Sequence, residues 1–157
     1  EAAGADFLVI PCNTAYVFGQ AVVDAVDIPL VSIIDETINA IPDDCAAVGL
    51  LATGGCLRAG VYQRALEARG IETIEPTAAE LSELMRAVTA IKAGEGDAAT
   101  ASTLRSLAET LVARGAGAVI AGCTEIPLAL KPSMLDVPLL SSTDILAQKT
   151  VQLALSE

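Results

Sequence analysis

The sequence reads Gly115-Ala-Gly-Ala-Val-Ile-Ala-Gly-Cys123-Thr124-Glu125 late in the chain and Gly4-Ala-Asp-Phe-Leu-Val-Ile-Pro-Cys12-Asn13-Thr14 near its start. Both stretches are apolar runs that end at a cysteine followed by polar residues. Each is followed by a second echo, Asp27-Ile-Pro-Leu-Val-Ser32 after the first and Asp136-Val-Pro-Leu-Leu-Ser141 after the second. A unit that occurs twice indicates two related lobes facing each other, because solenoids are built from more copies.

The pattern between these repeats predicts an α/β fold. Short apolar runs alternate with longer periodic segments, which is typical of βα units around a largely parallel sheet. We expect two pseudo-symmetric lobes with parallel sheets flanked by helices, the first lobe being incomplete. The predicted strands are 6–11, 29–33, 47–52, 71–74, 117–122 and 138–141, and the predicted helices are 15–26, 35–41, 58–69, 77–93, 97–114, 125–131 and 143–155.

The internal symmetry also predicts how the chain divides into lobes. We expect the strand after each cysteine-bearing unit to cross to the opposite lobe. Residues 29–137 then form the second lobe, and residues 1–28 and 138–157 are the remainder of the first. The chain opens at Glu1 on a segment that resembles the tail of a helix, so we expect an N-terminally truncated part of a longer protein.

Composition excludes several classes of partner. The net charge of −11 argues against nucleic acid and against anionic membrane surfaces, and 3% aromatic residues leave no platform for stacking bases. We find no apolar stretch long enough to span a membrane. The chain has 4 cysteines, spaced far apart, and no histidine, which argues against a zinc site and favours a reducing, cytoplasmic location.

The two repeated cysteines are the strongest candidates for chemistry. Cys12 and Cys123 each fall where a predicted strand ends, which is where ligands bind in open parallel sheets. A helix beginning there would lower the thiol pKa, and its free N–H groups would bind a carboxylate. Asn13, Thr14 and Thr124 add side-chain donors, and Glu125 would position a thiol or an ammonium group. A single buried cysteine is often only a small apolar residue, but the duplication argues against that interpretation here.

Other candidates have weaker support. Thr53 begins a glycine-bearing turn at 53–55 that would bind a carboxylate, although a turn needed only for packing explains it equally well. The turn matches neither a phosphate-binding loop nor a dinucleotide-binding loop. Lys92 would reach a second substrate carboxylate, against the alternative of a solvated surface lysine. Cys45 and Cys56 are not duplicated, and Cys45 is expected to be structural.

Three motifs in order carry a family resemblance: Pro11-Cys12-Asn13-Thr14-Ala15, Gly49-Leu-Leu-Ala-Thr53-Gly54 and Ala121-Gly122-Cys123-Thr124-Glu125-Ile-Pro-Leu128. The chain resembles the aspartate/glutamate racemase family over essentially its whole length, and its aspartate racemase branch most. The resemblance implies a two-lobed, commonly dimeric enzyme that needs neither pyridoxal phosphate nor metal. It further implies a small amino acid or dicarboxylate as the substrate.

The resemblance also implies roles for individual residues. Cys12 and Cys123 would act on opposite faces of the substrate α-carbon, one removing the proton and the other returning one. Asn13, Thr14, Thr53 and Thr124 would hold the α-carboxylate and amino group, and Lys92 the side-chain carboxylate. The sequence departs from the family at Tyr16, where relatives have histidine, and it has no counterpart of the family's opening strand.

Other functions remain open at this point. A decarboxylase or cis–trans isomerase of small dicarboxylates would reuse the same two-lobed fold, although the presence of both Cys12 and Cys123 disfavours the single-cysteine decarboxylases. A non-catalytic module that binds carboxylates is a second alternative, which Tyr16 and the missing lobe favour. A thiol redox function is a third, and it requires Cys12 and Cys123 close enough to form a disulfide.

Overall fold

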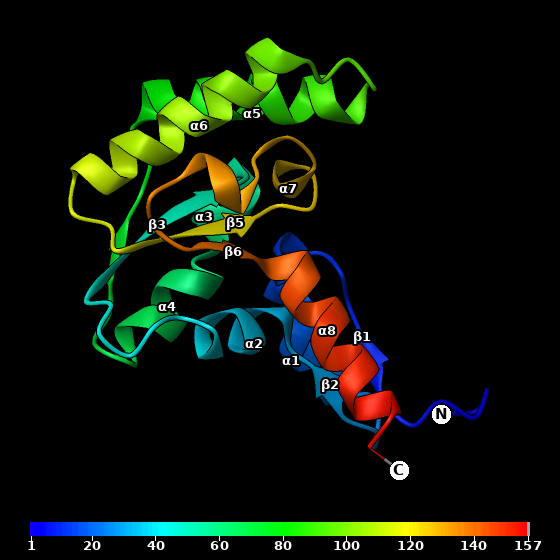
Figure 1. Cartoon of the computed structure of the whole chain (residues 1–157). Coiled ribbons are helices and arrows are strands. Elements are labelled where there is room, and N and C mark those ends of the chain that lie inside the picture. The colour runs from blue at the N-terminus through cyan, green and yellow to red at the C-terminus, as the bar shows by residue number, and fades with distance from the viewer. Residues whose placement is uncertain (157) are drawn as a thin grey trace.

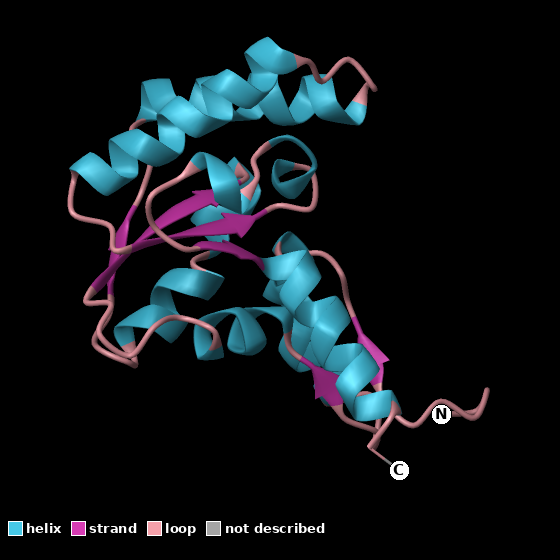
Figure 2. Cartoon of the chain, in the orientation of Figure 1, coloured by secondary structure: helices cyan, strands magenta, loops and turns pink. Residues whose placement is uncertain are grey.

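The computed structural model describes residues 1–156 and contains two parallel sheets with helices on their faces (Figure 2). This confirms the predicted α/β class. The larger sheet has the strand order β4-β3-β5-β6, and the smaller one pairs β1 with β2. The strands are β1 (Leu8–Val9), β2 (Leu30–Val31), β3 (Ala47–Ala52), β4 (Glu72–Ile74), β5 (Ala118–Gly122) and β6 (Leu139–Ser141).

Helices cover both faces of the larger sheet (Figure 1). One face packs against α5 (Ala78–Lys92), α6 (Ala98–Ala113) and α7 (Ile126–Ala129), and the other against α2 (Ile33–Asn39), α3 (Gly54–Ala59) and α4 (Val61–Glu67). The remaining helices are the 3₁₀ helices η1 (Thr14–Phe18) and η2 (Pro132–Met134), and α1 (Gly19–Val23) and α8 (Ser142–Ala154). None of the helices within residues 1–156 combines the length and apolar character that crossing a membrane requires.

The core lies on the two central strands of the larger sheet. All of β5 is buried, and so is β3 after its first residue, as expected for strands covered on both faces. Gly49 of β3 lets α6 approach closely, because a Cβ atom there would lie 2.8 Å from the Cβ of Leu111. In the smaller sheet each strand has one neighbouring strand among the described residues. Each strand has only 2 residues, far fewer than in the predicted strands 6–11 and 29–33.

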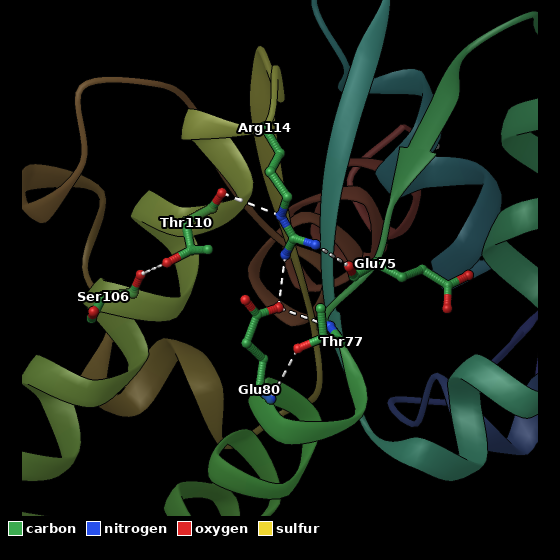
Figure 3. Close-up of polar contacts among 6 residues, drawn as sticks. All are labelled: Glu75, Thr77, Glu80, Ser106, Thr110 and Arg114. Atoms are coloured by element: carbon green, nitrogen blue, oxygen red, sulfur yellow. Dashed lines mark hydrogen bonds and ion pairs between the residues drawn. The ribbon is translucent and has the colours of Figure 1, made fainter.

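The long helices begin at capping residues that the sequence supplies. Thr77 and Glu80 form a capping box at the start of α5, and Asp97 caps α6. Arg114, just after α6, joins the two helices, since its guanidinium binds the Glu80 carboxylate at 2.8 Å and the Glu75 carbonyl at 3.1 Å (Figure 3). The start of α5 and the end of α6 are therefore held together beside β4.

The predicted strand crossing is wrong. β2 pairs with β1 in the smaller sheet, and β6 pairs with β5 in the larger one. Consecutive strands joined by a helical connection usually lie next to each other, and both pairs follow that rule. The exchange occurs one element later: Ser32 caps α2, which joins the core of the larger sheet, and Ser141 caps α8, which extends along the smaller sheet (Figure 1). The lobe division at 29–137 stays a prediction, and these pairings would place its limits at Ser32 and Ser141.

Three predicted helices differ from the structure. The single helix predicted over 58–69 is two helices, α3 and α4, separated by Gly60 at a φ of 65°. Helix α3 begins earlier than predicted, because the Thr53 side chain caps the Cys56 N–H. The segment 15–26 is the 3₁₀ helix η1 followed by the short α1. Helix α7 stops at Ala129, since Lys131 precedes a proline and is extended.

Candidate active site

The carboxyl ends of the two central strands place Thr53 beside Cys123. β3 and β5 are parallel, with Ala52 opposite Gly122. Thr53 directly follows β3, and Cys123 directly follows β5. Neighbouring strands lie about 4.8 Å apart, so the two residues are adjacent at one edge of the sheet. This edge is where ligands bind in open α/β sheets.

The first cysteine segment reaches the same edge through contacts with the start of α3. The Thr14 hydroxyl lies 3.1 Å from the Thr53 hydroxyl. The methyl group of Thr14 would also contact a Cβ atom on Gly55 at 3.4 Å, so η1 begins directly over the first turn of α3. Cys12, two residues before Thr14, is exposed there. The structure thus brings Cys12, Thr14 and Thr53 to the edge that carries Cys123.

Asn13 lies within a buried chain of hydrogen bonds, although the sequence suggested a substrate contact. Its side-chain amide donates to the Ser142 hydroxyl at 3.1 Å, and the Ser142 hydroxyl donates to the Ala121 carbonyl at 3.0 Å. The Tyr62 hydroxyl contacts the Asn13 side-chain oxygen at 2.6 Å. We call Tyr62, Asn13, Ser142 and the Ala121 carbonyl the Asn13 relay. With 3% of its surface exposed, Asn13 links the two cysteine segments.

Sequence reasoning missed Tyr62 and Ser142. Ser142 directly follows the second echo and is the first residue of α8. At this buried position its hydroxyl makes hydrogen bonds, where an apolar side chain would only pack. Tyr62 is one of only 2 tyrosines in the chain, and it is fully buried. A buried tyrosine usually finds a partner for its hydroxyl, so an isolated tyrosine in an aliphatic sequence was the available signal.

Cys123 is paired with a carboxylate. Its sulfur lies 2.9 Å from Glu125 Oε2, which also accepts from the Thr124 hydroxyl at 2.9 Å. Glu125 Oε1 lies 3.7 Å from the ammonium of Lys92, which projects from the end of α5. Four predicted site residues, Cys123, Thr124, Glu125 and Lys92, therefore form one cluster. Lys92 has 57% of its side chain exposed, which leaves its ammonium accessible to a further anion.

The protonation of Cys123 differs from the prediction of a lowered thiol pKa. Burial and, to a smaller extent, the hydrogen bond to Glu125 together raise the pKa of Cys123 to about 12. Burial of the Glu125 carboxyl raises its pKa, but the hydrogen bonds from the Cys123 thiol and the Thr124 hydroxyl act in the opposite direction, and the pKa is lowered overall. The short helix α7 after Cys123 is too weak a dipole to compensate. In this arrangement the proton resides on sulfur and the negative charge on Glu125.

Tyr16 has a structural contact instead of a partner in the cysteine pair. Its hydroxyl donates to the Val31 carbonyl at 2.9 Å and accepts from the Ile33 N–H at 3.1 Å. It therefore closes the junction between β2 and α2.

The two remaining cysteines have different surroundings. Cys45 donates from its thiol to the Ala47 carbonyl at 3.1 Å before the amino end of β3, far from the candidate site along the strand, as expected for a structural residue. Cys56 is fully buried in the first turn of α3. Burial, with a smaller electrostatic effect of the neighbouring Cys12, raises the pKa of Cys56 to about 11. Cys56 thus lies close to the candidate site but is covered.

Comparison with known proteins agrees with this architecture. The sequence profile of the Asp/Glu/hydantoin racemase family matches residues 1–150. The broad specificity amino-acid racemase RacX of Bacillus subtilis (strain 168) is 28% identical over 151 residues, which cover 96% of this chain and 66% of RacX. The chain thus spans just under two thirds of the length of that relative.

Solved structures show the same fold. The structure of PH1733, an aspartate racemase homologue from Pyrococcus horikoshii OT3, is 32% identical with a TM-score of 0.86, covering 98% of this chain and 68% of that one. The Picrophilus torridus aspartate racemase superposes with a TM-score of 0.84 at 22% identity, covering 98% and 64%. With a profile match over nearly the whole sequence, the chain belongs to the Asp/Glu/hydantoin racemase family.

Proposed function

We propose that the protein is a cofactor-independent amino-acid racemase for aspartate or glutamate, in which Cys12 and Cys123 act as acid and base. One observation carries the proposal: the two repeated cysteine segments meet at the carboxyl edge of the larger sheet, where Thr14 contacts Thr53 and Thr53 adjoins Cys123. The names of the relatives, a broad specificity amino-acid racemase and an aspartate racemase homologue, support the reaction class.

The proposed reaction moves two protons. The thiolate of one cysteine takes the α-proton of the substrate, and the thiol of the other gives its proton to the opposite face of the resulting carbanion. The two cysteines exchange roles for the opposite enantiomer. Donors positioned around the carboxylate stabilise the charge that develops on it, and we assign that role to Thr14, Thr53 and Thr124.

Glu125 and Lys92 would govern the protonation and binding. The raised pKa of Cys123 supports its role as the thiol that donates a proton when Cys12 is the base. In the reverse direction, Cys123 would act as a thiolate and take up the α-proton, and the Glu125 carboxylate 2.9 Å from its sulfur would stabilise the resulting thiol. Lys92 would leave its 3.7 Å contact with Glu125 to bind the substrate's side-chain carboxylate. Asn13 would support the site from below, with one amide hydrogen still available.

Two further proposals concern the intact protein. We propose that it works in the cytoplasm as a homodimer, as the family resemblance suggests. Light scattering combined with size exclusion would give the mass of the particle. A mass of one chain at working concentration would contradict the dimer and leave the racemase proposal intact.

The decisive experiment is isotope incorporation. The intact protein, incubated with L-aspartate or L-glutamate in deuterated water, should place deuterium at the α-carbon and form the D enantiomer. Cys12→Ser and Cys123→Ser should each lose racemisation by about 100-fold or more, because general acid–base groups contribute on that order. Cys45→Ser is the matched control, since Cys45 lies at the amino end of β3, at the opposite end of that strand from Thr53. Racemisation at the original rate in either of the first two variants would refute the assignment of both thiols.

A further inference from the structure

The Asn13 relay is buried along its whole length. Tyr62 and Ser142 have no exposed surface, and Asn13 has 3%. Its four members come from four parts of the fold: α4, the segment after β1, the first residue of α8, and β5. Asn13 and Ser142 are separated by 129 positions in the sequence. Buried side-chain networks of this kind specify one arrangement when every member has a partner.

The chemistry of the relay fixes the direction of every hydrogen bond. The Ala121 carbonyl can only accept, so Ser142 must donate its single hydrogen to it. Ser142 is then left as an acceptor, and Asn13 must present its NH₂ group there. The other end of the Asn13 amide is therefore its oxygen, and the Tyr62 hydroxyl must donate to it.

A neighbouring hydroxyl is a second, more distant acceptor for this proton. Thr37 donates to the Ile33 carbonyl at 2.6 Å, and its oxygen lies 3.5 Å from the Tyr62 hydroxyl. The single hydrogen of Tyr62 thus goes to Asn13, which is the shorter contact at 2.6 Å. Removal of the Tyr62 hydroxyl would leave the Asn13 oxygen buried without a donor, so that the Asn13 side chain would be held only by its hydrogen bond to Ser142.

The relay connects the two cysteine segments through buried side chains. Asn13 directly follows Cys12, and Ala121 lies two residues before Cys123 on β5. The Asn13 amide therefore helps to set the position of the exposed Cys12 segment relative to the β5 strand end, together with the contact of Thr14 with Thr53. The ring of Tyr62 also packs beside Gly122, the residue before Cys123, where a Cβ atom would lie 3.4 Å from Tyr62 Cε2.

We propose that Tyr62 is a positioning residue for the reaction, which aligns the Cys12 thiol against Cys123 by orienting Asn13. This inference rests on the proposed racemase function. A displacement of a reacting group by about 1 Å can lower a rate by about 100-fold, so loss of the hydroxyl should act mainly on kcat. Substrate binding, which depends on other donors and on Lys92, should change much less.

The test compares Tyr62→Phe with Thr37→Val in the intact protein. Both variants remove one buried hydroxyl from neighbouring helices and keep the volume of the side chain. We expect Tyr62→Phe to lower kcat for racemisation by about 10- to 100-fold with KM within about threefold. Thr37→Val should keep kcat within about twofold at a comparable loss of thermal stability.

Ser142→Ala tests the same inference at the other end of the relay, and it leaves Tyr62 in place even if Tyr62→Phe does not fold. It should lower kcat by a similar factor, and the double variant should lose no more than the more impaired single variant, because both act through Asn13. Losses that multiply in the double variant, or a wild-type kcat in either single variant, would overturn the inference. Absence of α-proton exchange in the wild type would instead refute the proposed function, and this inference with it.

Discussion

Glu125→Gln is the substitution that tests the electrostatics of the site most directly. It removes a negative charge 2.9 Å from the Cys123 sulfur and preserves the size of the side chain. Two unit charges at that distance interact by about 6 kcal/mol at an effective dielectric of about 20 and by about 1.4 kcal/mol in bulk water. At about 1.4 kcal/mol for each pKa unit, the pKa of Cys123 should fall by between about 1 and 4.

The expected value lies toward the smaller end of that range. The ammonium of Lys92, 3.7 Å from Glu125, already offsets part of the carboxylate's effect. Burial is the larger cause of the raised pKa of Cys123 and remains in the variant. The pKa of the variant thiol should therefore fall from about 12 but stay above the ordinary value of 9.0.

The assay is the rate of alkylation of Cys123 by iodoacetamide as a function of pH, followed by mass spectrometry of the peptide that contains it. Alkylation reports the thiolate fraction, so the midpoint of the rate curve gives the pKa. Glu109→Gln is the matched control, because Glu109 makes an exposed ion pair with Arg105 and carries the same charge. An unchanged or raised pKa of Cys123 in Glu125→Gln would refute the reasoning that the carboxylate holds the proton on sulfur.

Four further predictions follow from particular contacts. Lys92→Met should raise KM for aspartate by about 10-fold, because breaking a charge-assisted hydrogen bond has about this cost. The effect on KM for neutral amino acids should be smaller, and an equal effect on both would contradict the role of Lys92. Arg114→Ala should lower the free energy of unfolding in urea by about 1 kcal/mol, and Arg105→Ala, which breaks an exposed pair, by less. Gly49→Ala should destabilise by about 1 to 3 kcal/mol, because its Cβ would lie 2.8 Å from Leu111, and a neutral result would mean that α6 moves freely on β3. The free energy of unfolding should fall as pH rises from 9.0 toward about 12, since the folded Cys123 thiol keeps a proton that the unfolded chain releases. In urea titrations, Cys123→Ala should remove up to about 4 kcal/mol of that pH dependence.

The larger sheet could be predicted to within about one residue at each end. β3, β5 and β6 are apolar runs buried on both faces, and such runs identify themselves by composition. The helices α5 and α6 were also predictable, because Thr77 and Asp97 mark their starts. The smaller sheet was predicted too long, since its apolar residues lie beside only one neighbouring strand in the described chain.

The site was predictable only where the sequence repeats itself. Duplication identified Cys12 and Cys123, the glycine-bearing turn added Thr53, and the predicted helix end and the family resemblance added Lys92. Tyr62 and Ser142 could not be found in this way, because the contact that gives each a role joins residues 49 and 129 positions from Asn13. A pattern confined to neighbouring residues carries no information about such pairings.

The two repeats give their cysteines unequal surroundings, and that inequality has a kinetic consequence. Cys12 is exposed on its loop, and Cys123 is 7% exposed beside a carboxylate that favours its protonated form. For a racemase in water the two enantiomers have equal free energies, so kcat/KM must be the same in both directions whatever the thiols do. The asymmetry can therefore appear only as a division between kcat and KM, with the free enzyme resting in the state in which Cys123 holds its proton. In the proposed mechanism, each turnover that uses that proton leaves Cys123 as a thiolate, and the Glu125 carboxylate 2.9 Å from the sulfur favours its reprotonation.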